Sequence, residues 1–286
     1  MKQVSEFSKW LLDIGDGIIG TNISDEQSEI VFPSDMLVRN LGLPIQSIAS
    51  TIYGDLFEKH NDEGYFRDRS ILSPTLDDVH EVNEMLLDQF PGDEKLYLSS
   101  DSICKFEENC DLLSELYTTE ILNSIKGSGL PNHKIRLKVG VPVMLMRNID
   151  KSIGLCNGTR LIVSKLDEHV IEAIPLSGRS VGQKILIARM LITPSNSKIP
   201  LKFQRRQFPL TLSFAMTINK SQGQSLSMVG LYLPKSVFTH GQLYVALSRV
   251  RSRAGIKLLI AHSSKDVAGK LITLSIDKYF KMLDDL

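Results

Sequence analysis

One polar stretch carries most of the groups that could bind a phosphate: Phe214-Ala-Met-Thr-Ile-Asn-Lys-Ser-Gln-Gly-Gln-Ser-Leu226, directly after an apolar run. Hydroxyl, amide and ammonium groups can all bond phosphate oxygens, and a glycine lets a backbone N–H approach. The residues concerned are Thr217, Asn219, Lys220, Ser221, Gln222 and Gly223. Ligands of α/β proteins bind where parallel strands end, so this stretch is a candidate binding loop. Its composition also fits a polar surface loop with helix-capping residues.

A second candidate is Arg249, at the end of the expected helix 241–248. A planar guanidinium near a helix end suits a bidentate grip on phosphate, including the role of an arginine finger that stabilises a transferring phosphoryl group. Arg251 and Arg253 follow closely. The alternative for any of these arginines is a solvated side chain or an ordinary surface salt bridge.

The sequence contains no Gly-x-x-x-x-Gly-Lys-Ser/Thr loop for a triphosphate. Gly269-Lys270 comes nearest, but Leu271 replaces the hydroxyl residue and Ser264 replaces the first glycine. No apolar strand ends in an Asp-Glu pair that could hold magnesium. We therefore expect that this chain alone neither binds nor hydrolyses a nucleoside triphosphate.

The remaining metal and redox signals are weak. Cys104, Cys110 and Cys156 are too few and too irregular for a zinc site or a disulfide framework, and no two histidines share the four-residue spacing of a helical metal site. We assign no metal ligand. The polar start and the lack of a long apolar run predict a soluble intracellular protein with no membrane partner.

The elements that would position the candidate residues follow an α/β pattern. Ile71-Leu72 is an expected strand, and it leads through Ser73, Pro74 and Thr75 into a helix whose apolar residues recur every three or four positions up to Phe90. Thr75 and Asp78 resemble a capping box. Further expected elements are a strand at 96–103, a helix at 112–124, a strand at 210–216, the loop 217–224, strands at 228–233 and 255–261, and a closing helix at 265–283.

Between these α/β parts, the pattern becomes that of β-structure. After the linker 126–132, apolar residues alternate with others from Ile135 to Leu145, which predicts one half-buried strand. Asn157-Gly158 has the chemistry of a two-residue hairpin turn, and β-rich runs follow at 170–175 and 184–192. Several short strands with tight turns predict a small inserted barrel.

Charge is distributed unevenly along the chain. The 33 Lys+Arg and 33 Asp+Glu cancel, but residues 1–125 contain 8 basic and 25 acidic residues, a net charge of −17, and residues 126–286 contain 25 and 8, a net charge of +17. A zero total therefore does not exclude a polyanionic partner for the second half. The other interpretation is an ordinary charged surface divided unevenly by chance.

The candidate binding loop at 214–226 and the Arg249 helix resemble parts of superfamily-one helicases of the petite-integration-frequency (Pif) type, in particular their Helitron-like branch. The loop is similar to the fifth signature motif of that family, and the helix is similar to the sixth. Three further stretches fit the same pattern in order: 71–75 with its helix, 137–145 through 154–160, and Arg205-Arg-Gln-Phe-Pro209.

The resemblance implies an α/β fold, namely a RecA-like parallel-sheet domain with an inserted small Src-homology-three-like β-barrel. The expected layout is a connector at 1–69, the first part of the second RecA-like domain at 70–134, the barrel at 135–207 and the second part of that domain at 208–286. The implied roles lie in DNA repair, DNA recombination and telomere maintenance, with a nuclear location.

The resemblance also implies roles for the candidate residues. Single-stranded DNA would contact Ser73, Pro74, Thr75, Thr217, Asn219, Lys220, Ser221 and Gln222. Gly223 and Gln224 would lie near the nucleotide, and Arg249 would reach its γ-phosphate. Asn219 stands where many members of the wider family have histidine, so it keeps hydrogen bonding and lacks an aromatic face.

The resemblance further implies a first RecA-like domain that holds ATP and Mg²⁺, and we expect that domain to be missing from this chain. The first hypothesis is therefore the C-terminal motor half of an ATP-dependent DNA helicase, inactive as an ATPase alone. The second is a non-catalytic single-stranded-DNA-binding or interaction module left from a truncated transposon-derived helicase. A third is a chain that folds poorly because its acidic segment lacks a packing partner.

Overall fold

The computed structural model describes residues 2–24, 27–40, 42–104, 117–127, 129–194, 202–234, 240–261 and 270–274. The chain forms two compact units. Unit one contains residues 1–59, 68–86 and 214–286, and unit two contains residues 60–67 and 87–213. No helix in these described ranges is long and apolar enough to cross a membrane.

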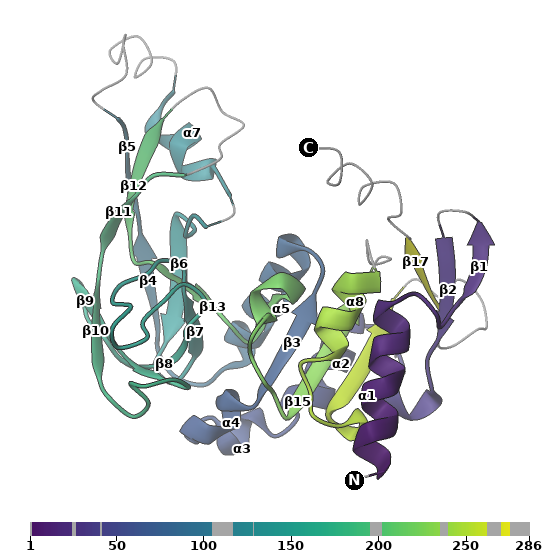
Figure 1. Cartoon of the computed structure of the whole chain (residues 1–286). Coiled ribbons are helices and arrows are strands. Elements are labelled where there is room, and N and C mark those ends of the chain that lie inside the picture. The colour runs from purple at the N-terminus through teal and green to yellow at the C-terminus, as the bar shows by residue number, and fades with distance from the viewer. Residues whose placement is uncertain are drawn as a thin grey trace. The chain divides into compact units, whose positions relative to one another are not determined.

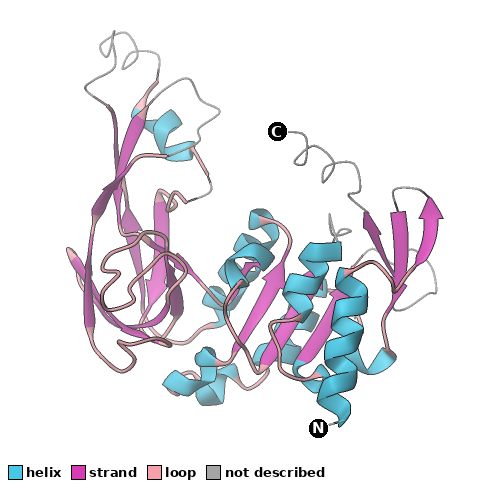
Figure 2. Ribbon diagram, in the orientation of Figure 1, coloured by secondary structure: helices cyan, strands magenta, loops and turns pink. Residues whose placement is uncertain are grey.

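Unit one is built on a four-stranded parallel sheet in the order β14-β3-β15-β16 (Figures 1 and 2). The strands are β14 Ala215–Thr217, β3 Arg69–Ser73, β15 Met228–Leu233 and β16 Ile256–Ile260. Their side chains are almost all buried, as expected for parallel strands covered on both faces. This sheet confirms the prediction of an α/β fold.

Helices flank this sheet. Helix α2 (Pro44–Tyr53) packs against β3, β15 and β16 and buries Ile48 and Ile52. Helix α1 (Lys2–Gly15) packs against α8 (His240–Leu247), and the two lie side by side in Figure 1. Helix α5 (Leu76–Gln89) follows β3. The other described helices of unit one are the short α3 (Leu56–Lys59), η1 (Ser34–Met36), η2 (Ile218–Ser221) and η3 (Arg253–Gly255).

A small antiparallel sheet in unit one contradicts one prediction. It consists of β1 (Thr21–Ser24), β2 (Gln27–Val31) and β17 (Lys270–Leu274), with β17 paired to β2. The closing helix predicted for 265–283 is therefore wrong at 270–274, where pairing with β2 outweighs local helix preference. The rest of that predicted helix lies outside the described residues.

Unit two is mainly antiparallel β-structure. Its largest sheet has the order β10-β9-β8-β7-β13, and further sheets are β11-β12-β5 and β4-β6. The strands are β4 Glu94–Leu98, β5 Ser100–Ile103, β6 Lys134–Lys138, β7 Pro142–Leu145, β8 Arg160–Leu166, β9 Val170–Pro175, β10 Ile185–Ala188, β11 Met190–Ile192, β12 Phe203–Gln207 and β13 Leu210–Leu212. Helices α4 (Glu63–Arg67) and α7 (Thr119–Ser124) also belong to it.

Four predicted β-segments are each divided in two. The β-rich run 184–192 divides at Arg189 into β10 and β11, which belong to different sheets. The strand expected at 135–145 breaks between β6 and β7 at Gly140, whose φ of +92° few other residues adopt. The strand expected at 96–103 divides into β4 and β5 at Ser99. The strand expected at 210–216 divides into β13 and β14, which belong to different units.

Two local predictions fare differently. Of the helix expected at 112–124, the structure places Thr119–Ser124 in α7, and residues 111–116 lie outside the described ranges. Asn157-Gly158 does form a tight turn, in which the Thr159 N–H donates to the Cys156 carbonyl at 3.0 Å. That turn lies inside the long β7–β8 connection, so it does not join two strands directly.

Candidate functional site

The predicted turn at Ser73–Thr75 and the predicted loop at 217–224 meet at the carboxyl ends of two neighbouring strands of the parallel sheet. Ser73 ends β3, Thr217 ends β14, and these two residues are register partners in the parallel pairing of the strands. The turn that leaves β3 and the loop that leaves β14 therefore begin side by side. This is the carboxyl-end position at which α/β proteins bind ligands.

The turn after β3 is organised by one carboxylate. The hydroxyls of Ser73 and Thr75 both donate to Asp78 Oδ2, at 3.2 and 2.6 Å. The Asp78 N–H donates back to Thr75 Oγ1 at 3.2 Å, which confirms the predicted capping contact at the start of α5. Ser73 is fully buried, and Pro74 and Thr75 are half-buried. Of these three side chains, only those of Pro74 and Thr75 reach solvent.

The predicted loop after β14 begins with one short helical turn, η2. Ile218 and Ser221 are fully buried, and the Ser221 hydroxyl donates to the Ile218 carbonyl at 2.6 Å. Asn219 and Gln222 are exposed, while Thr217 and Lys220 are half-buried. The Ser221 side chain therefore supports the turn from inside, and the other four side chains are partly or fully exposed.

The end of this loop is a tight backbone turn. Gly223 has a φ of +80° and open space around the position of a Cβ atom, so its backbone is exposed. The Gln224 N–H donates to the Ser221 carbonyl at 3.0 Å, and its side-chain Nε2 donates to the Lys220 carbonyl at 3.3 Å. Gln224 thus stabilises the loop it belongs to.

Arg249 reaches this loop from just beyond α8. Its Nη1 donates to the carbonyls of Ser221 and Gln224 at 3.3 and 3.2 Å. Its Nε donates to the Val245 carbonyl at 2.7 Å and its Nη2 to the Ser248 hydroxyl at 2.8 Å. The structure thus brings Arg249 together with the predicted loop.

The electrostatics of Arg249 favour an anion. All of its hydrogen-bond partners within the described residues are neutral. Partial burial lowers the pKa of its guanidinium, and nearby Tyr244 opposes that change. A partly desolvated cation whose partners carry no negative charge would gain from a bound phosphate.

The two neighbouring arginines are placed differently. Arg251 and Arg253 are both exposed, and Arg253 forms an ion pair with Asp35. That pairing lowers the pKa of the Asp35 carboxyl. Of the three arginines, Arg249 alone forms hydrogen bonds with the predicted loop among the described residues.

Two residues that sequence reasoning missed hold the β14 edge in place. Asn83 of α5 is buried, its Nδ2 donates to the Ala215 carbonyl at 3.1 Å, and its Oδ1 accepts from the Ala215 N–H at 2.8 Å. The Tyr53 hydroxyl donates to the Phe214 carbonyl at 2.7 Å. The available signal for Asn83 was an amide one position after Val82, on the apolar side of a predicted helix.

The Arg205-Arg-Gln-Phe-Pro209 stretch has a structural role in unit two. Arg205 is fully buried and forms an ion pair with Asp101, with Nη2 2.7 Å from Oδ2. Its guanidinium also donates to the carbonyls of Leu122, Asn123, Ile125 and Pro131. Gln207 is buried as well and donates to the carbonyls of Tyr97, Asn132 and His133.

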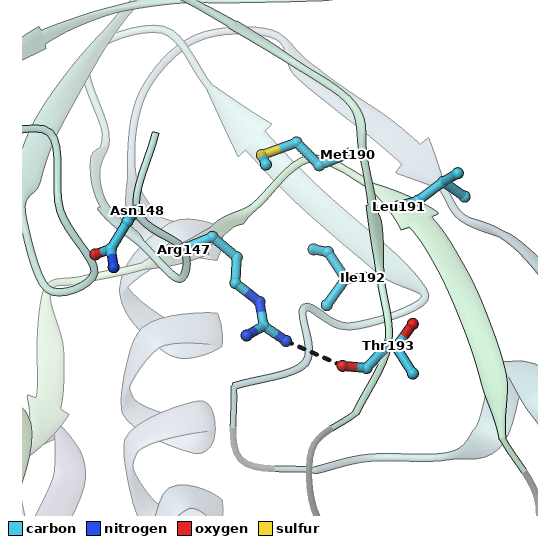
Figure 3. Close-up of a pocket in the computed structure, with 6 residues that line it drawn as sticks. All are labelled: Arg147, Asn148, Met190, Leu191, Ile192 and Thr193. Atoms are coloured by element: carbon cyan, nitrogen blue, oxygen red, sulfur yellow. Dashed lines mark hydrogen bonds between the residues drawn. The ribbon is translucent and has the colours of Figure 1, made fainter. Parts of the chain in front are cut away.

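A pocket of about 390 Å³ lies in unit two. Its lining residues are Arg147, Asn148, Met190, Leu191, Ile192 and Thr193 (Figure 3). Arg147 extends towards Thr193, and its Nη2 donates to the Thr193 carbonyl at 3.2 Å, while the Leu191 side chain points away from Arg147 (Figure 3). None of the predicted site residues lines it. In the part of the chain that the structure describes, no three His, Cys, Asp or Glu side chains gather into a metal site.

Comparison with known proteins places the chain near one group of helicases. The sequence family described as "DNA helicase Pif1, 2B domain" matches residues 120–166. The ATP-dependent DNA helicase PIF1 of Xenopus laevis is 34% identical over 184 residues, which cover 64% of this chain and 26% of that protein. The human ATP-dependent DNA helicase PIF1 is 32% identical over 187 residues, with the same coverage. The chain spans about a quarter of the length of these relatives.

Solved structures show the fold. The crystal structure of Pif1 helicase from Candida albicans matches with a TM-score of 0.52 at 24% identity, covering 84% of this chain and 57% of that one. Pif1 helicase from Bacteroides in complex with ADP-AlF3 and ssDNA matches with a TM-score of 0.50 at 21% identity, covering 86% and 54%. The parallel sheet of unit one is thus part of a RecA-like α/β fold.

Proposed function

We propose that this chain, which contains a Pif1-type helicase region, is the C-terminal motor half of an ATP-dependent DNA helicase. In this proposal it binds single-stranded DNA at the carboxyl ends of β3 and β14. It also supplies Arg249 to ATP that a first RecA-like domain outside these 286 residues holds. The observation that carries the proposal is the convergence of the β3 turn, the β14 loop and Arg249.

The DNA contacts would come from the outward-facing groups. Thr217, Asn219, Lys220 and Gln222 offer donors for phosphate and sugar oxygens, and Pro74 and Thr75 line the neighbouring turn. Ser73 and Ser221 would act indirectly, because both are buried and their hydroxyls donate within the chain. The β3 turn also carries the Asp78 carboxylate, so the loop after β14 is the better place for a DNA phosphate.

The nucleotide side of the proposal rests on Arg249. Its charge has neutral partners, and Gln224 and Gly223 lie on the loop it contacts, so the donor set suits an anionic phosphate. ATP and Mg²⁺ belong to the complete enzyme in this proposal, with neither held by this chain alone, because the sequence has no triphosphate loop. There Arg249 would stabilise the charge on the transferring phosphoryl group.

The domain layout is part of the same proposal. We assign residues 135–207 to an inserted small Src-homology-three-like β-barrel and residues 70–134 and 208–286 to the second RecA-like domain, after a connector at 1–69. The match of residues 120–166 to the 2B-domain family overlaps the proposed barrel and supports this assignment. Roles in nuclear DNA repair, recombination and telomere maintenance, and membership of the Helitron-like branch, extend the proposal.

DNA binding by the chain itself is the first test. A labelled single-stranded oligonucleotide should bind, and its affinity should fall as salt rises, by a slope of about 0.7 in log K against log salt for each phosphate contact. Lys220→Gln should lower both affinity and slope, whereas Lys165→Gln, an exposed lysine of unit two, should change neither. Absence of any salt-dependent binding would overturn the proposal.

ATP turnover separates the motor from the alternative, a non-catalytic DNA-binding or interaction module. The chain alone should show no DNA-stimulated hydrolysis. Joined to a first RecA-like domain that carries the triphosphate loop, it should hydrolyse ATP, and Arg249→Ala should abolish that turnover. DNA binding without turnover in the joined protein would favour the non-catalytic module.

A further inference from the structure

We infer that Arg249 is also a positioning residue for the loop Thr217–Gln224, an inference that rests on the proposed function of that loop. The guanidinium donates to two backbone carbonyls of the loop, those of Ser221 and Gln224. Both bonds come from one nitrogen of one rigid, planar group. They hold in place the turn whose tip is Gly223.

The loop needs such a contact because much of it faces solvent. Gln222 and Gly223 are exposed, and the turn itself contributes the bond from the Gln224 N–H to the Ser221 carbonyl. Just beyond, the Leu226 N–H donates to the Arg249 carbonyl at 2.9 Å. The segment from 221 to 226 is thus tied to residue 249 at three points, two of them through the side chain.

The same contacts couple the loop to any anion that Arg249 binds. A guanidinium has five N–H donors, and four hydrogen bonds already use them here. A bidentate phosphate contact requires two N–H groups. At least one present bond must therefore break when a phosphate is bound in this way, and the bonds to Ser221 and Gln224 are the longest. A phosphate that displaces either of these two bonds loosens the loop.

Hydrogen exchange measured on the intact chain, without nucleotide or DNA, directly tests the contact between Arg249 and the loop, here called the brace. Arg249→Gln removes the charge and the planar guanidinium, and Arg249→Lys keeps the charge without the guanidinium. Both should speed amide exchange in residues 221–226 by about tenfold, as expected for the loss of one or two hydrogen bonds. Arg251→Gln removes the same charge from an exposed neighbour and should leave that exchange unchanged.

The affinity of each variant for a single-stranded oligonucleotide tests the functional consequence. Arg249→Gln should weaken binding several-fold more than Arg251→Gln does, because it frees the loop in addition to removing one charge. Wild-type exchange rates at 221–226 in both Arg249 variants would overturn the brace, and so would faster exchange spread evenly over β3 and β15. Faster exchange confined to the loop, in a chain that binds no DNA, would leave the brace standing and refute the proposed function.

Discussion

Replacing Asn83 should loosen the site without touching any ligand. β14 lies at the edge of the parallel sheet, so only β3 pairs with its backbone within the described residues. The Asn83 amide takes the place of a further strand, because it both donates to and accepts from Ala215. Asn83→Ala leaves that N–H and that carbonyl without these partners in a buried position.

The size of the effect follows from those two groups. A buried backbone group that loses its partner costs about 1–3 kcal/mol, which would total about 2–6 kcal/mol for the pair. An edge strand can fray and reach water, so we expect the lower end, about 2–3 kcal/mol. A local loss of about 2 kcal/mol corresponds to a roughly 30-fold change in an equilibrium constant. The Ala215 amide should therefore exchange about 30-fold faster.

Urea unfolding and hydrogen exchange of the purified chain measure this loss, and Gln89→Ala, an exposed change on the same helix, is the control. Asn83→Asp sharpens the test, because its carboxylate would face the Ala215 carbonyl. Only the protonated form can donate there, so the pKa of that carboxyl should be raised in the folded state. Relative to wild type, the variant should be most stable below about pH 4, the pKa range of an unfolded Asp, and lose that stability as pH rises through the raised pKa. Equal stability of Asn83→Ala and wild type, with unchanged exchange at Ala215, would refute the reasoning.

Two further predictions concern unit two. Asp101→Asn should cost about 3–5 kcal/mol in urea unfolding, because it leaves the fully buried Arg205 charge uncompensated, and a loss below about 1 kcal/mol would argue against a buried ion pair. Burial raises the pKa of Tyr97 from 10.0 to about 12, so the unfolded chain deprotonates first and stability should fall as pH rises from 10 towards 12. Tyr97→Phe should make that fall smaller, and a Phe variant with the same alkaline loss would contradict it.

Sequence patterns predicted the elements whose environment is uniform along their length. The strand expected at 228–233 is β15 residue for residue, because a strand buried on both faces is a continuous apolar run bounded by polar residues. The helix after Thr75 was also predicted correctly, since the period of its apolar residues and its capping residue indicate the same helix. Where local signals and packing coincide, the sequence is sufficient.

The failures occur where packing changes within one run. The stretch from Leu210 to Met216 reads as one apolar strand, yet β13 pairs with β7 in unit two and β14 pairs with β3 in unit one. Apolar residues occur in both halves, and no glycine or proline marks the change near Phe214. The helix prediction at 270–274 is wrong for a related reason, because the strand that pairs with this segment, β2, lies more than 200 residues earlier in the chain.

The same limit applies to the site, as two arginines illustrate. Arg205 and Arg249 both belong to motif-like stretches, and both are wholly or partly buried. The charge of Arg205 is paired with that of Asp101, so this guanidinium has a structural role inside unit two. The charge of Arg249 is met only by neutral oxygens among the described residues, so a phosphate would improve its environment. Residue type alone does not distinguish the two arginines, and the sign of the neighbouring charge, which only the fold determines, separates them.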